Sequence, residues 1–328
     1  MAATAGSSPH TRPAVRRRES IVKWLLAGDP AIRWQVFRDL TDATPDEVAA
    51  ERARVAREGF GAALLARQRP DGTWAPSDGP AGAPDPGWMI TIRTLTLLKD
   101  FGADPESPAV RTAIDRVKPL RFTWHDNRLF FDGESEPCLN GRILGLGAYF
   151  GEPSAELLAR LLSEQLPDGG WNCDAPHESH VSSFHTTICV LEGLLAWEEA
   201  QGFSEPVTAA RHRAENYVLD RRLMRGLRSG EIIDRRFTRF GWHPNWQYDV
   251  LRALDYFRAA GATPDERMSE AIGIVEERAH QNGLWPLNRQ GPGAIGYVTE
   301  AEVGAPSRWN TLRALRVLDW YSGSPAVA

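Results

Sequence analysis

Long apolar runs and an excess of one charge are both missing from this sequence. No stretch of about 18 apolar residues occurs, so we expect no transmembrane segment. The 38 basic and 43 acidic residues are interleaved and leave a net charge of −5, without the basic surface that nucleic-acid-binding proteins present. We therefore expect binding neither to nucleic acid nor to an anionic membrane surface.

Cysteine is also scarce. Three cysteines without a secretory signal are typical of reduced thiols in a cytoplasmic protein rather than of disulfides. Residues 1–18 are rich in Ala, Ser, Pro and Arg, and we expect them to form a disordered tail. The rest of the chain, residues 19–328, is predicted to be one domain.

The alternating pattern of β-strands is weak throughout, and a repeated turn is prominent instead. Asp-Gly-Thr-Trp at 71–74, Asp-Gly-Gly-Trp at 168–171 and Asn-Gly-Leu-Trp at 282–285 are three copies of it. Weaker copies lie at 132–134 and 229–231, so the spacing is roughly 36 to 61 residues, the range of helix-pair repeats. The sequence therefore predicts an all-α fold.

Each turn separates two segments with helical periodicity, which gives about twelve helices in six pairs. The outer helices are predicted at 19–26, 49–68, 108–117, 153–165, 206–224 and 264–280. The inner helices are predicted at 29–40, 88–101, 138–150, 182–200, 246–260 and 308–321. Six inner and six outer helices close a ring, an (α/α)6 toroid, and the starts of the inner helices should surround the mouth of a central cavity.

The segments 68–74 and 165–171 begin with glutamine and end with tryptophan. They resemble the glutamine-tryptophan motif of squalene-hopene cyclase and of protein prenyltransferase β subunits, a resemblance that extends over about residues 24–321. It implies an α/α toroid, and the resemblance to a β subunit also suggests a helical partner subunit.

The acidic Asp-x-Asp-Asp cluster of the squalene cyclases is absent, and Ser-Ser-Phe-His-Thr-Thr stands at 182–187 instead. Residues 184–194 are similar to the prenyltransferase segment whose histidine binds zinc. Glu136-Pro137-Cys138 stands where that family has Asp-x-Cys. The resemblance therefore implies a zinc site of Glu136, Cys138 and His185, although the basic residues that bind the diphosphate in that family are missing.

Further candidates for the site lie around these residues. Cys173 and Asp174, in the loop before residue 182, could act in catalysis beside the metal. Asp249 is the candidate proton donor for a metal-free cyclase, because apolar walls can keep a carboxyl neutral. Arg142, inside an inner helix, could bind a diphosphate.

Aromatic residues gather at or near the starts of the predicted inner helices. They could line a cavity for a flexible polyene, and filling of the core is the alternative for each of them. These candidates for substrate binding are Trp88, Phe184, Trp242, Trp246, Tyr248 and Trp309.

The sequence thus predicts a prenyltransferase-like or terpenoid cyclase-like enzyme with an isoprenoid, or a similarly long apolar substrate, in a central aromatic cavity. Zinc would activate a thiol or water there. Two alternatives remain open: a metal-free cyclase that uses a carboxylic acid, and a non-catalytic toroid that binds a lipid or a protein.

Overall fold

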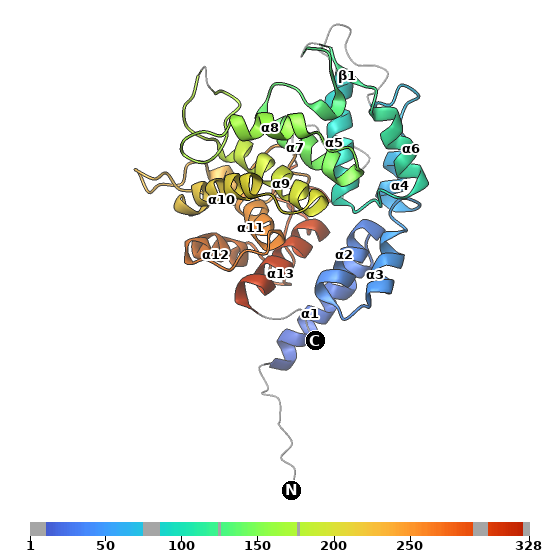
Figure 1. The fold of residues 1–328 in the computed structure, drawn as a ribbon. Helices are drawn as coiled ribbons and strands as arrows, with labels where there is room; N and C mark the ends of the chain where they lie inside the picture. The colour runs from blue at the N-terminus through green and yellow to red at the C-terminus, as the bar shows by residue number, and fades with distance from the viewer. Residues whose placement is uncertain (1–10, 75–85, 124–125, 176–177, 291–300, 324–328) are drawn as a thin grey trace.

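A computed structural model describes residues 11–74, 86–123, 126–175, 178–290 and 301–323 (Figure 1). The described part contains thirteen α-helices, three short 3-10 helices and one hairpin of two-residue strands. The hairpin pairs β1 (Arg121–Phe122) with β2 (Arg128–Leu129). The prediction of an all-α fold is confirmed.

Six helices form the inner ring of the molecule. They are α2 (Pro30–Leu40), α5 (Pro86–Asp100), α7 (Pro137–Phe150), α9 (Phe184–Gln201), α11 (Val250–Ala259) and α13 (Arg308–Ser322). Helix α7 packs between α5 and α9, and α11 packs on α13. Helix α13 in turn packs on α2, so that the last inner helix meets the first and the ring closes (Figure 1). The toroid predicted from the turns is the fold observed.

The other helices lie outside this ring. They are α1 (Thr11–Leu26), α3 (Pro45–Arg52), α4 (Gly59–Leu65), α6 (Pro108–Val117), α8 (Ala155–Ser163), α10 (Glu205–Asp220) and α12 (Ser269–Glu277). The 3-10 helices η1 (Phe130–Asp132), η2 (Arg235–Thr238) and η3 (Glu266–Met268) lie in the connections.

Two boundaries differ from those expected. The single helix expected at 49–68 is wrong, because α3 and α4 are separated by a turn before Gly59, whose φ of 64° is left-handed. Helix α1 begins at Thr11, whereas no ordered structure was expected before residue 19. Residues 1–10, the rest of the expected tail, lie outside the described part.

The three tryptophans of the repeated turn make the same hydrogen bond. The indole Nε1 of Trp74, Trp171 and Trp285 donates to a carbonyl ten residues earlier, at Leu64, Leu161 and Val275, over 2.7 to 2.8 Å. Each turn is thereby fastened to the outer helix that precedes it.

The glutamines of the motif connect successive outer helices. Gln68 Nε2 donates to the carbonyl of Ala113 in α6, and Gln165 Nε2 donates to that of Ala210 in α10, both at 2.8 Å. The turn also requires glycine: Gly72 has a φ of 86°, and a Cβ there would lie 2.2 Å from the carbonyl oxygen of Arg116. Glutamine, glycine and tryptophan therefore hold the ring together from outside.

Helices α7 and α9 approach each other more closely than side chains would allow. A Cβ on Gly193 would lie 2.1 Å from the carbonyl oxygen of Gly141, and one on Gly141 would lie 2.6 Å from that of Cys189. This contact fixes the starts of α7 and α9 relative to each other, and the candidate metal ligands lie at those starts.

Among the described residues, no helix is both long enough and apolar enough to cross a membrane.

Candidate functional site

The six inner helices, together with α3, line an open central cavity of about 810 Å³. Its lining is more polar than the sequence led us to expect, because eight basic and four acidic side chains reach it. The basic residues are Arg38, Arg52, Lys99, Arg142, Arg252, Arg258, Arg313 and Arg316, and the acidic residues are Asp100, Glu192, Glu199 and Asp255. The expectation of a mainly aromatic cavity is therefore corrected.

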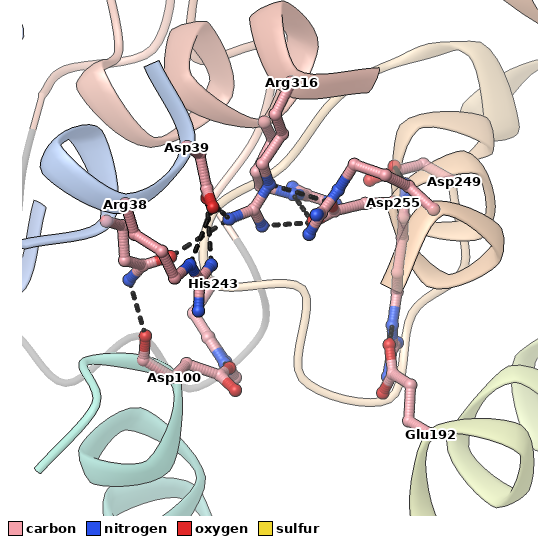
Figure 2. A network of polar contacts seen from close by, with 12 residues as sticks. Arg38, Asp39, Asp100, Glu192, His243, Asp249, Asp255 and Arg316 are labelled. Atoms are coloured by element: carbon pink, nitrogen blue, oxygen red, sulfur yellow. Dashed lines mark hydrogen bonds and ion pairs between the residues drawn. The ribbon is translucent and has the colours of Figure 1, made fainter. Parts of the chain in front are cut away.

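Most of the buried charge on one side of the cavity is paired. Arg252 donates through Nε and Nη2 to both carboxylate oxygens of Glu192, at 2.7 and 2.6 Å. Arg316 lies between Asp255 and Asp39 (Figure 2). Burial alone would raise the pKa of Asp255, but the neighbouring arginines outweigh it and hold that pKa well below its usual range. We call this set of charges, on α2, α9, α11 and α13, the paired wall.

Arg142 on α7 also lines the cavity, but in different surroundings. Its Nη1 donates to Asn245 Oδ1 and its Nη2 to Thr96 Oγ1 at 3.1 Å. Its Nε is buried without a partner. Burial lowers the pKa of Arg142, and the like charge of Arg252 lowers it further. We call Arg142, Thr96 and Lys99, on α5 and α7, the Arg142 wall.

A histidine and an aspartate that the sequence analysis missed meet between the walls. His243 Nε2 lies 2.7 Å from Asp100 Oδ2, and both residues line the cavity (Figure 2). Burial lowers the pKa of His243, although Asp100 opposes that shift. His243 Nδ1 accepts a hydrogen bond from the backbone N–H of Asn245 at 3.3 Å, so the pair also fixes the loop that carries Asn245.

Three metal-capable groups meet at the start of α7. A ligand atom from each of Glu136, Cys138 and Cys173 lies within 4.8 Å of the other two. Cys138 Sγ lies 3.5 Å from Glu136 Oε2, and Cys173 Sγ lies 3.4 Å from Thr186 Oγ1 on α9. These three groups are the ligand cluster.

The two thiols of the ligand cluster are not equivalent. A hydrogen bond from Cys138 lowers the pKa of Cys173, despite the opposing effect of burial. The same bond, together with burial, raises the pKa of Cys138 far above its usual value.

His185, the third zinc ligand expected from the resemblance, does not belong to this group. Its Nδ1 accepts a hydrogen bond from the backbone N–H of Tyr248 at 2.8 Å, and its ring packs against Phe237 and Trp246. Consecutive residues on a helix point roughly 100° apart, so the neighbouring Thr186 faces the cluster in its place. Burial lowers the pKa of His185 to about 4.

The two candidate catalytic aspartates occupy other environments. Asp249 is fully buried at the start of α11, where its carboxylate accepts from the backbone N–H of Arg252 at 2.8 Å and pairs with Arg289 at 3.4 Å. These contacts are those of a helix cap, and Asp249 is not among the described residues that line the cavity. Asp174 is exposed, and its carboxylate is not among the groups found in the cluster.

The aromatic candidates divide between three environments. Trp242 and Trp309 line the central cavity and stack on each other at a ring separation of 4.1 Å. Phe184 and His185 line a second cavity at the surface, and Tyr248 is buried against Phe184. Trp88 packs on Phe122, and Trp246 is partly exposed beside His185. Only two of the six aromatic candidates thus belong to the described central cavity.

No family model matches this chain, and no curated protein matches it either. The solved structures that resemble it in fold include two of one enzyme. The first is the type II terpene cyclase MstE from Scytonema in its apo form, with a TM-score of 0.46 and 16% identity over 93% of this chain and 96% of that one.

The second is a variant of MstE in complex with its product, merosterolic acid A, with a TM-score of 0.44 and 14% identity over 95% of this chain and 99% of that one. Identity at this level does not carry the activity of that enzyme over to this chain.

Proposed function

We propose that this chain is a zinc-dependent enzyme that acts on an isoprenoid, or on a similarly long organic molecule, in the central cavity. The observation that carries the proposal is the ligand cluster, in which Glu136, Cys138 and Cys173 meet within 4.8 Å. Two thiols and a carboxylate are a ligand set that zinc accepts, with a fourth position left open in catalytic sites. The ligands differ from the set that the resemblance implied, because Cys173 takes the place of His185.

The residues around the cluster suit this role. Glu134 accepts a hydrogen bond from the backbone N–H of Glu136 at 2.5 Å and fixes the start of α7. Thr186 contacts Cys173 and holds the loop against α9. When bound, zinc lowers the pKa of a coordinated thiol or water and makes it nucleophilic near neutral pH.

Glu136, Cys138 and Cys173 are not among the described residues that line the cavity, but α7 connects the cluster to it. Cys138 precedes Arg142 by four residues on α7, so the two side chains lie on one face of that helix, one turn apart. Arg142 lines the cavity, and the stacked Trp242 and Trp309 offer an apolar surface within it. A substrate could therefore lie on the tryptophans and reach the cluster with one end.

Metal analysis of purified variants tests this proposal. We expect the wild type to retain close to one zinc ion per chain after dialysis, and Cys138→Ser and Cys173→Ser to lose it. His185→Asn is the matched control, because His185 is next to Thr186 in the sequence but lies outside the cluster. This variant should keep its zinc.

Two results would count against the proposal. One is wild-type protein that binds no zinc, and the other is a His185→Asn variant that loses zinc as readily as the cysteine variants. Activity is then assayed by incubation of zinc-loaded protein with prenyl diphosphates and a small thiol, and analysis of the products by mass spectrometry.

A further inference from the structure

The described residues include three arginines that are at least nine-tenths buried, and one of them differs from the others. Arg142, Arg252 and Arg313 are 6%, 5% and 4% exposed, and all three line the central cavity. Arg252 pairs with Glu192, and Arg313 lies 3.6 Å from Asp255. Arg142 has no carboxylate within ion-pair distance in the part of the chain that the structure describes.

The partners that Arg142 does have are neutral. Asn245 and Thr96 each accept one hydrogen bond through an oxygen. A guanidinium carries five N–H donors, so three remain, including the buried Nε that lacks a partner. A buried charge without a counter-charge is costly, so an arrangement of this kind is retained where something else supplies the negative charge.

The thiol of Cys189, which lines the same cavity, does not supply it. Cys189 is fully buried, and this burial raises the pKa of its thiol, so the thiol stays neutral. Lys99, one turn from Thr96 on α5, adds positive charge to the same wall, and its nearest carboxylate is that of Asp100, at 3.9 Å.

We propose that Arg142, held between Asn245 and Thr96, is the subsite for an anionic oxygen group of a small molecule in the central cavity, either a carboxylate or a phosphate. This inference rests on the proposed function only in taking that cavity as the substrate site. Arg142 follows Cys138 by four residues on α7, ~6 Å of helical rise, so the anionic end of the molecule would lie on the side of the cavity nearest the ligand cluster.

The test is a titration of full-length, chelator-treated protein by calorimetry with three probes that share one hydrocarbon chain. Geranyl diphosphate carries a phosphate head, geranic acid a carboxylate, and geraniol no charge. We expect at least one of the two anions to bind roughly 10- to 100-fold more tightly than geraniol, as one charge-assisted hydrogen-bonded site allows. The stronger of the two anions identifies the head group.

Arg142→Met is the decisive variant. It should lose this 10- to 100-fold preference and bind all three probes alike. Arg142→Lys keeps the charge but not the planar fork, and it should retain part of the preference. Equal binding of geraniol and the anions by the wild type, or an unchanged preference in Arg142→Met, would overturn the proposal.

Stability distinguishes this role from a structural one. If Arg142 serves a ligand, Arg142→Met should unfold at a denaturant concentration equal to or higher than that of the wild type, because an unpaired buried charge is removed. A variant that is less stable or does not fold would show that the guanidinium supports the fold, and it would also overturn the proposal.

Zinc content separates the two proposals. Arg142→Met should keep the zinc content of the wild type, and Cys138→Ser should keep the preference for anions in the chelated state. Anion binding by a protein that binds no zinc would refute the proposed function and leave the subsite standing. Zinc binding without any preference for anions would refute the subsite and leave the proposed function standing.

Discussion

The two walls of the central cavity use arginine in opposite ways. On the paired wall, Arg252 is saturated by both oxygens of Glu192, and Arg316 is shared by Asp255 and Asp39. On the Arg142 wall, the partners of an equally buried guanidinium are, among the described residues, an amide and a hydroxyl. Burial alone therefore does not distinguish a structural arginine from one that is available to bind a ligand. The charge of its partner makes the distinction.

The largest effect is expected from breaking the paired wall. Arg252→Met leaves Glu192 at the cavity without its cation and should lower the free energy of unfolding by ~3 kcal/mol, the lower end for a buried pair that loses one partner. Glu192 is 36% exposed, which argues for the lower end. Chemical denaturation measures the loss, and the double variant Arg252→Met/Glu192→Met should recover most of it. A single variant as stable as the wild type would show that the pair contributes nothing.

The paired wall should also respond to acid. Burial would raise the pKa of Asp255, but Arg316, Arg258 and Arg313 lower it below its ordinary 3.8, so the unfolded chain binds the proton more readily than the folded one. The stabilisation is then complete above about pH 4 and is lost as the pH falls below that value. Denaturation measured between pH 7 and pH 2 should show that Asp255→Asn is less stable than the wild type at pH 7. Its free energy of unfolding should then fall less steeply with decreasing pH than that of the wild type. Parallel curves for the two proteins would contradict this.

Giving the Arg142 wall a carboxylate should make it resemble the paired wall. Thr96→Asp places an acid where the hydroxyl now accepts from Arg142 Nη2, and we expect a gain of ~1 kcal/mol in the free energy of unfolding. The same change should abolish the preference for anionic probes. Thr96→Val is the matched control, which removes the acceptor without adding charge and should not stabilise the protein. A stabilised valine variant would show that charge is not the cause.

The smallest effect is expected where a charge pair is open to water. Arg38 pairs with Asp39 at 2.6 Å, but its side chain is 44% exposed. Arg38→Gln should therefore change the free energy of unfolding by less than ~0.5 kcal/mol, since exposed pairs contribute little. A loss as large as that of Arg252→Met would mean that the rim of the cavity is part of the paired wall after all.

The fold could be predicted from short-range features of the sequence. Gly72, Gly169 and Gly283 have left-handed backbones, and the tryptophan two residues after each makes its hydrogen bond within the same unit. The residues that determine each turn thus lie within about ten positions of one another. The ring itself was predicted from the count of six helix pairs and from the resemblance to known toroids, since helix pairs can also stack into open solenoids.

The site was less predictable because it depends on contacts between distant segments. The spacing of the motifs correctly placed Cys138 at the start of α7. Whether His185 or Thr186 faces the cluster depends on how α9 is rotated about its axis, which the spacing does not determine. His243 and Asp100 are 143 positions apart, and His243 lies in an irregular loop, so no local pattern marked them. Nor does the sequence reveal that Arg252 has a carboxylate partner, whereas Arg142 has none within the described ranges.

The closure of the ring by α13 and α2 has a consequence for biosynthesis. Helix α2 is made early, yet the surface that covers one of its sides is not translated until residues 308–322. During synthesis that side of α2 stays open, and the paired wall lacks Arg316 until α13 has left the ribosome. A nascent chain that stalls before that helix would expose apolar surface, which makes it a target for chaperones and proteases.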